Sequence, residues 1–272
     1  MPDVELTASE MRINREIASS LVGLVRVSAS SKREDAQPLG SATLVTIGGR
    51  SGLLTAAHVL NVAPRVVGLV RFPPHGGKVE RPMVDLGHAQ RVAFGLGNIG
   101  AEGPDIGFVE LPSDAKTSLE ARGNVFFNLD LRRDSVTAGR YETKPYMHCT
   151  VGVIAEWTTE FQGPSTLVKN IEGFNQLGKI SPTRTHAGFD LIDFVPHFSD
   201  DDKRPTSYGG MSGGALWRIM GVLDNGTFVV TDKVLHGVVF YETPLSEGNR
   251  RLVCHGPLSI YSRLYDAISA RR

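Results

Sequence analysis

The chain has 272 residues, of which 41% are hydrophobic and 21% are charged, and its 29 basic residues balance its 29 acidic residues. This length is enough for an all-β architecture that buries a sizeable core. A formal net charge of zero gives no electrostatic reason to expect nucleic acid or an anionic membrane as a partner, and no apolar run is long enough to span a bilayer.

The first 20 residues predict a short helix. Thr7 and Glu10 have the spacing of a capping box, and Met11, Ile13 and Ile17 follow among charged residues. We expect this helix to pack on the outside of a first barrel. The same residues lack the basic and apolar regions of a secretory signal.

Short strand-like runs, separated by Gly, Pro, Asn and Asp, follow from residue 21. The strands predicted for the first half are 21–27, 41–47, 53–56, 65–71, 90–94 and 106–110. A linker at residues 112–123 leads to a second set, at 146–158, 165–169, 189–195, 214–218, 227–230, 234–241 and 251–254. Such a pattern predicts a β-barrel architecture.

The end of the chain predicts a closing helix, because Ile260, Leu264 and Ile268 recur every four residues. The predicted organisation is therefore a helical segment at 1–20, a first barrel at 21–122, and a second barrel with the closing helix at 123–272.

Cysteine usage bears on the compartment. The chain has only Cys149 and Cys254, and we expect two buried, reduced thiols rather than the one bridge they could form. Together with the lack of a secretory signal in these residues, this predicts a cytoplasmic protein, and a leader that has been removed is the alternative.

Three residues far apart in the sequence suggest nucleophilic catalysis. His58 and Asp105 each lie at the edge of a predicted strand, and Ser212 lies among the glycines of segment 210–214. A serine hydroxyl becomes a good nucleophile when an imidazole takes its proton and a carboxylate fixes the imidazole tautomer. The structural alternatives are a histidine that ends a buried strand, a turn aspartate after Pro104, and a small residue in a glycine-rich turn.

Several segments together resemble trypsin-like serine peptidases of the chymotrypsin fold. Segments 40–45 and 53–60 resemble the histidine block of that family, and segment 105–111 resembles its aspartate block. Segment 210–214 matches Gly-x-Ser-Gly-Gly, and segment 236–241 resembles the strand that lines the substrate cleft. The order His, Asp, Ser is also that of the family.

The resemblance implies an all-β fold of two six-stranded antiparallel β-barrels of chymotrypsin type with short terminal helices. It implies a serine endopeptidase that hydrolyses peptide bonds through a Ser212–His58–Asp105 triad and an acyl-enzyme. The backbone N–H groups of Gly210 and Ser212 would hold the oxyanion. No metal or cofactor is expected; a protein or peptide is the expected substrate, and a regulatory protein partner stays open. The alternative is a protease-shaped binding or scaffold module whose site is unused or gated by a partner.

Met211 departs from the family pattern. In trypsin-like zymogens an aspartate at this place pairs with a newly cut N-terminus and shapes the oxyanion loop, and a thioether cannot form that ion pair. The loop must therefore form without N-terminal trimming, or through a partner.

The candidate substrate-binding residues are Thr206, Phe240, Tyr241 and Glu242. Thr206 falls where trypsin has the acid at its pocket floor, so no salt bridge to a substrate Lys or Arg is expected. Glu242 replaces a glycine of the pocket wall, and it either narrows or charges the pocket or turns to solvent.

Three further patterns predict ordinary structure. Residues 95–100 satisfy the dinucleotide-binding expression but predict a loop, because no helix follows. Residues 200–204 predict a solvated surface loop. The pairs at 148–149 and 254–255 have metal-ligand residue types without the spacing of a zinc site.

Overall fold

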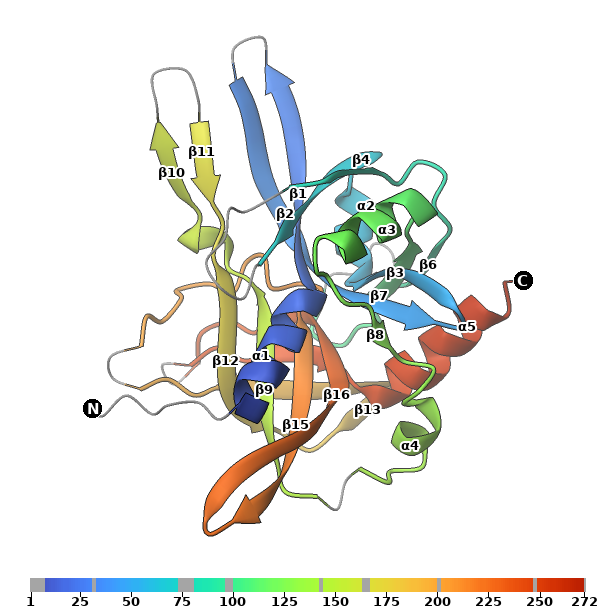
Figure 1. The fold of residues 1–272 in the computed structure, drawn as a ribbon, viewed down its shortest axis with the longest axis vertical. Helices are drawn as coiled ribbons and strands as arrows, with labels where there is room; N and C mark the ends of the chain where they lie inside the picture. Colours follow the sequence, from blue (N-terminus) through green and yellow to red (C-terminus); the bar gives the residue numbers. More distant parts are fainter. Residues whose placement is uncertain are drawn as a thin grey trace.

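Two mainly antiparallel sheets form most of the protein (Figure 1). The computed structural model describes residues 8–30, 33–72, 81–95, 100–141, 144–162, 167–199, 202–246 and 249–271. The predicted all-β character is confirmed at this level.

The first sheet is a curved, half-barrel arrangement. Its order is β5-β4-β1-β2-β3-β7-β6, and β8 adds a short parallel pairing to β2. The strands are β1 Leu21–Ser30, β2 Arg33–Ile47, β3 Arg50–Thr55, β4 Val66–Arg71, β5 Met83–Asp85, β6 Arg91–Phe94, β7 Ile106–Glu110 and β8 Phe127–Asn128. Within the described residues no pairing joins β5 to β6, so this ladder stays open.

The second sheet closes on itself. Its order is β12-β9-β15-β16-β17-β14-β13, and a further pairing of β12 with β14 completes a ring. The strands are β9 Tyr146–Val153, β12 Gly173–Ile180, β13 Arg184–His186, β14 Phe189–Pro196, β15 Ala215–Asp224, β16 Thr227–Glu242 and β17 Leu252–His255. A separate hairpin, β10 Thr159–Gln162 with β11 Leu167–Asn170, projects on the same side as β1 and β2 (Figure 1).

The strand count differs from two sets of six. The ring of the second sheet has six strands and β13 as an extension, but the first sheet has eight. The extra strands of the first sheet, β5 and β8, have three and two residues, too few to show an alternating pattern. The two strands predicted at 227–230 and 234–241 are one continuous strand, β16, because the polar residues between them still pair with β15.

Helix α1, Ala8–Ser20, is present, but its packing corrects the prediction. Ile13 and Ile17 are buried in one hydrophobic cluster with Ile219 and Val230 of the second sheet. The helix therefore packs chiefly against β16, with a smaller contact to β2, rather than on the outside of the first sheet. The predicted capping residue Thr7 lies outside the described residues.

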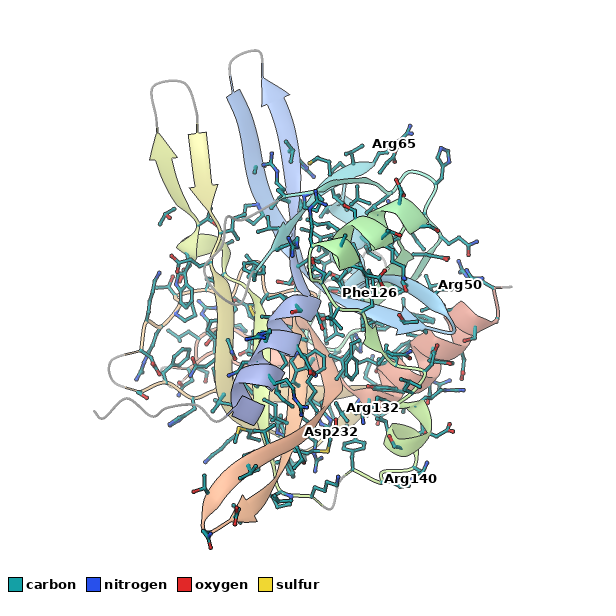
Figure 2. All side chains as sticks on the ribbon, viewed as in Figure 1. Arg50, Arg65, Phe126, Arg132, Arg140 and Asp232 are labelled. Carbon is teal, nitrogen blue, oxygen red and sulfur yellow. The ribbon has the colours of Figure 1, made fainter. Side chains whose placement is uncertain are left out.

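The predicted linker contains a helix. Residues Ser113–Ala121 form α3, which buries Leu119, and Arg133–Thr137 form the short helix α4. Just before α4, Arg132 makes two hydrogen bonds of 2.7 Å to the Asp232 carboxylate on β16 (Figure 2). This paired contact fastens the connection to the second sheet.

The predicted closing helix is confirmed in position. A π-helical segment, Ser259–Leu264, continues into α5, Tyr265–Ser269. Ile260 and Leu264 have no exposed surface and Ile268 is buried, so the spacing of four marks the packed face.

Both cysteines are free and buried, as expected. Burial raises the pKa of Cys149 to about 12 and raises that of Cys254 well above its usual range. None of the described helices is long and apolar enough to cross a membrane. The described ranges also hold no group of three or more His, Cys, Asp or Glu side chains arranged to bind a metal ion.

Candidate active site

His58 and Asp105 form a hydrogen-bonded pair. His58 lies in the first turn of α2, Ala57–Val62, directly after β3, and Asp105 directly precedes β7. Because β3 and β7 pair in antiparallel fashion, the end of β3 lies beside the start of β7, and this brings the two residues together. Asp105 Oδ1 accepts the His58 backbone N–H at 2.9 Å, and Asp105 Oδ2 lies 2.5 Å from His58 Nδ1.

The two residues of the pair differ in exposure, and their contact fixes the tautomer of His58. Asp105 is 1% exposed, whereas the His58 side chain is 23% exposed. The contact with the carboxylate assigns the ring proton to Nδ1, so that Nε2 is left able to accept a proton. This arrangement is the one that a general base requires.

Ser212 lies in the tight turn before β15. The backbone conformation of this turn requires glycine at two positions. Gly210 and Gly213 have φ values of +96° and +89°, which side-chain-bearing residues rarely adopt. A Cβ on Gly213 would lie 1.9 Å from the Ser41 carbonyl oxygen. The Ser41 N–H donates to the Ser212 carbonyl at 2.8 Å, which ties this turn of the second sheet to β2 of the first.

His58 and Ser212 line one cleft of about 240 Å³ at the junction of the two sheets. Phe240, Tyr241 and Glu242 line it as well, so the structure gathers most of the predicted site residues in one place. The remaining lining residues are Tyr208, Gly209, Met211, Val239 and Leu252.

The backbone of the turn leaves two donors free. In the described part of the chain, neither the Gly210 N–H nor the Ser212 N–H donates to an acceptor. The Gly210 carbonyl is held separately, because it accepts from the Ser41 hydroxyl at 2.7 Å. The same hydroxyl accepts the Val153 N–H at 2.8 Å, and this fixes the orientation of the turn.

Met211 packs as an apolar residue beneath this turn. It is 1% exposed and belongs to a cluster that includes Ile154, Phe174 and Tyr208. A Cβ on Gly152 would lie 2.5 Å from the Met211 sulfur, so the thioether fills the space over that glycine. The turn is therefore supported from below without an ion pair.

Thr206 lies outside the cleft lining. It is exposed, and both its N–H and its hydroxyl donate to the Glu156 carboxylate, the N–H at 2.6 Å. Burial opposes ionisation of Glu156, but hydrogen bonds from Thr206 and Ser207 and the charge of Lys203 outweigh it and lower its pKa.

Glu242 turns toward the protein rather than toward solvent. Its carboxylate accepts the Ser207 hydroxyl at 3.1 Å and the Tyr208 N–H, and it pairs with Arg250 at 3.2 Å. It therefore links the segment before Ser212 to β16, the two walls of the cleft. Burial, with the nearby charge of Glu242, raises the pKa of Tyr208 to about 12, so its phenol is neutral.

One contact of the site was not predicted from the sequence. The Asp105 N–H donates to Nε2 of His255 at 2.8 Å. In the sequence, His255 is only a metal-ligand type beside Cys254, because a hydrogen bond between residues 150 positions apart leaves no signal in residue spacing.

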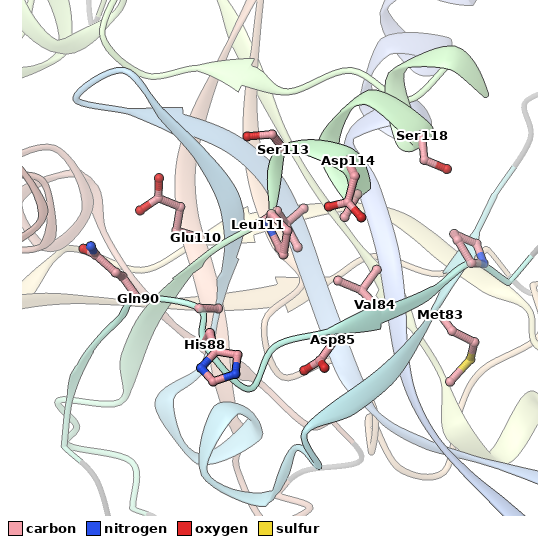
Figure 3. Close-up of a pocket in the computed structure, with 14 residues that line it drawn as sticks. Met83, Val84, Asp85, His88, Gln90, Glu110, Leu111, Ser113, Asp114 and Ser118 are labelled. Atoms are coloured by element: carbon pink, nitrogen blue, oxygen red, sulfur yellow. The ribbon is translucent and has the colours of Figure 1, made fainter.

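A larger cavity, of about 680 Å³, lies between β5 and α3 (Figure 3). Its acidic side chains include Asp85, which pairs with Arg65, and Glu110, which pairs with Arg50. None of the predicted site residues lines it. Most of the predicted site residues therefore gather at the smaller cleft and not at this cavity.

No protein-family model matches the chain, and no curated protein matches it in sequence.

Proposed function

We propose that the protein is a serine endopeptidase with a chymotrypsin-type pair of barrels, resembling trypsin-like peptidases. One observation carries the proposal: the buried Asp105 binds His58, and His58 and Ser212 line one cleft at the junction of the two sheets. The curved first sheet and the closed second sheet support the two-barrel assignment.

The proposed reaction gives each triad residue a distinct role. Ser212 Oγ attacks the carbonyl carbon of a peptide bond while His58 Nε2 takes its proton. His58 then gives that proton to the leaving amine, and an acyl-enzyme remains. Water repeats the cycle and releases the acid product. Asp105 stabilises the imidazolium that forms in each half-reaction.

The free N–H groups of Gly210 and Ser212 support an oxyanion site. A tetrahedral intermediate develops negative charge on the former carbonyl oxygen, and one preorganised donor is typically worth about 3 kcal/mol of transition-state stabilisation. The Ser41 contacts to Gly210 O and Ser212 O hold the turn in place before substrate arrives, so little reorganisation is needed.

The cleft favours a small, neutral side chain on the acyl side of the cleaved bond. Val239, Phe240 and Leu252 give it apolar walls, and the Glu242 carboxylate is already engaged by Arg250. A basic substrate side chain would compete with Arg250 for the same carboxylate. We therefore expect small apolar residues to be preferred over Lys or Arg.

The test is labelling with a fluorophosphonate, which reacts with an activated serine. The folded wild type should be labelled at Ser212, and Ser212→Ala should be unlabelled. Mass spectrometry should show the labelled chain to be uncut, because Met211 needs no new N-terminus as a partner. A folded, unlabelled wild type would favour a binding or scaffold module instead. A cytoplasmic location and a regulatory partner stay predictions.

A further inference from the structure

A buried histidine outside the triad holds the backbone of Asp105. His255 is the last residue of β17 and has no exposed surface, and its Nε2 accepts the Asp105 N–H at 2.8 Å. Because Asp105 precedes β7, this hydrogen bond joins the second sheet to the first. Asp105 is therefore held twice, at its carboxylate by His58 and at its backbone by His255.

The partners of His255 fix one tautomer. Nε2 accepts, so the ring proton belongs on Nδ1, which faces Ser259 Oγ at 3.3 Å. The Ser259 hydroxyl in turn donates to Asp190 Oδ1 at 2.6 Å and accepts the Asp190 N–H at 3.1 Å. One donor and two acceptor positions of the hydroxyl are thus all used.

The surroundings keep the ring neutral. Burial lowers the pKa of His255 to about 4, although the negative charge of Asp105 acts in the opposite direction. At neutral pH the Nε2 lone pair is therefore available to the Asp105 N–H.

The ring also has little space in which to move. It stacks on Phe240 with 4.4 Å between ring centroids and 27° between planes. On the side of Gly103, an added Cβ would lie 3.1 Å from His255 Cε1. Phe240 lines the cleft, so the same packing joins the wall of the cleft to the support of Asp105.

We propose that His255 is a positioning residue that holds Asp105, and through it His58, in register with Ser212. The inference rests on the proposed peptidase function. The second sheet carries Ser212 and the first carries the His58–Asp105 pair. The His255–Asp105 hydrogen bond joins the sheets on the side of Asp105, as the Ser41 hydrogen bonds do on the side of Ser212, and so helps to set their relative placement. A misplacement of about 1 Å between reacting groups can cost about 100-fold in rate.

Two amide variants separate this role from simple loss of a core residue. In His255→Gln the amide has the same reach from Cβ as Nε2 and still accepts the Asp105 N–H. In His255→Asn the amide reaches only the Nδ1 position, so the contact with Ser259 is kept and that with Asp105 is lost. We expect His255→Asn to lower kcat about 100-fold with little change in KM, and His255→Gln to stay within about tenfold of wild type.

A low-field proton NMR resonance from the His58–Asp105 hydrogen bond gives a second readout, which needs no turnover. It should persist in wild type and His255→Gln and be lost or broadened in His255→Asn. His148→Asn, which changes another buried histidine of the second sheet, should alter neither the resonance nor kcat. If His255→Asn does not fold, Ser259→Ala is the second variant. It removes the acceptor that keeps the His255 ring proton on Nδ1, so Nε2 accepts the Asp105 N–H less well, and kcat should fall about tenfold.

Equal kcat values for the folded Asn and Gln variants would overturn the proposal, as would an equal loss in His148→Asn. A folded wild type that shows the resonance but does not react with a fluorophosphonate would overturn the peptidase function instead.

Discussion

At the scale of single residues, Glu242 lines the same cleft as His58 and Ser212. Its carboxylate bridges the segment before Ser212 and β16, with Arg250 as its ionic partner. Glu242→Gly should remove the bridge and open the cleft, so that kcat/KM for substrates with a large apolar side chain at the acyl position rises at least about tenfold. A peptide-library cleavage profile measures this change.

Glu242→Gln is the matched control, because it keeps the size of the side chain and a contact to the Ser207 hydroxyl. It should retain the preference for small side chains. A profile of Glu242→Gly that matches wild type would show that another group limits the cleft.

At the scale of elements, the turn from Tyr208 to Gly214 is supported by packing rather than by an ion pair. Met211→Asp would bury a carboxylate in an apolar cluster with no cationic partner, at a cost of about 3 to 5 kcal/mol in the free energy of unfolding. Labelling of Ser212 should fall with it. Met211→Leu conserves the apolar volume and should cost less than about 1.5 kcal/mol.

Urea unfolding and the rate of fluorophosphonate labelling measure both variants. Should Met211→Asp label as fast as wild type, the turn would not depend on the packing of Met211.

The same elements show which features a sequence reveals. Strand β7 has a clear apolar pattern between Pro104 and Pro112, and its predicted bounds are the observed ones. The periodic Ile260, Leu264 and Ile268 marked the closing helix. Strand β12 was missed because its residues are mostly polar or exposed, with Phe174 as its one buried side chain. Helix α1 was placed on the wrong sheet, since periodicity identifies an apolar face but not its partner.

In the candidate site too, features set by local sequence were predicted and contacts between distant elements were not. His58, Asp105 and Ser212 could be selected from local context, because each needs particular neighbours in the chain. The contacts of His255 with Asp105, and of Glu242 with Tyr208, depend on which strands meet, and residue spacing does not record this.

At the scale of the whole molecule, buried histidines should make the fold sensitive to acid. The rings of His148 and His236 lie 5.0 Å apart, measured between their centroids. The Arg218 guanidinium lies over the rings of Tyr141 and Tyr146. Burial, reinforced by the charge of Arg218, lowers the pKa of His148 to about 4 from the ordinary 6.5. Burial, with the charges of His148 and Arg218, lowers that of His236 to about 3.

Between pH 6.5 and about 4, the unfolded chain therefore binds protons that the folded chain excludes. The free energy of unfolding should fall as the pH decreases through this window, by about 3 kcal/mol for His148. Urea unfolding at a series of pH values measures the slope. His148→Gln should make the slope shallower without abolishing it, because the buried His236 and His255 still contribute. His88→Gln, at an exposed position, should leave the slope unchanged. A slope that His148→Gln leaves unchanged would mean that other groups cause the acid sensitivity.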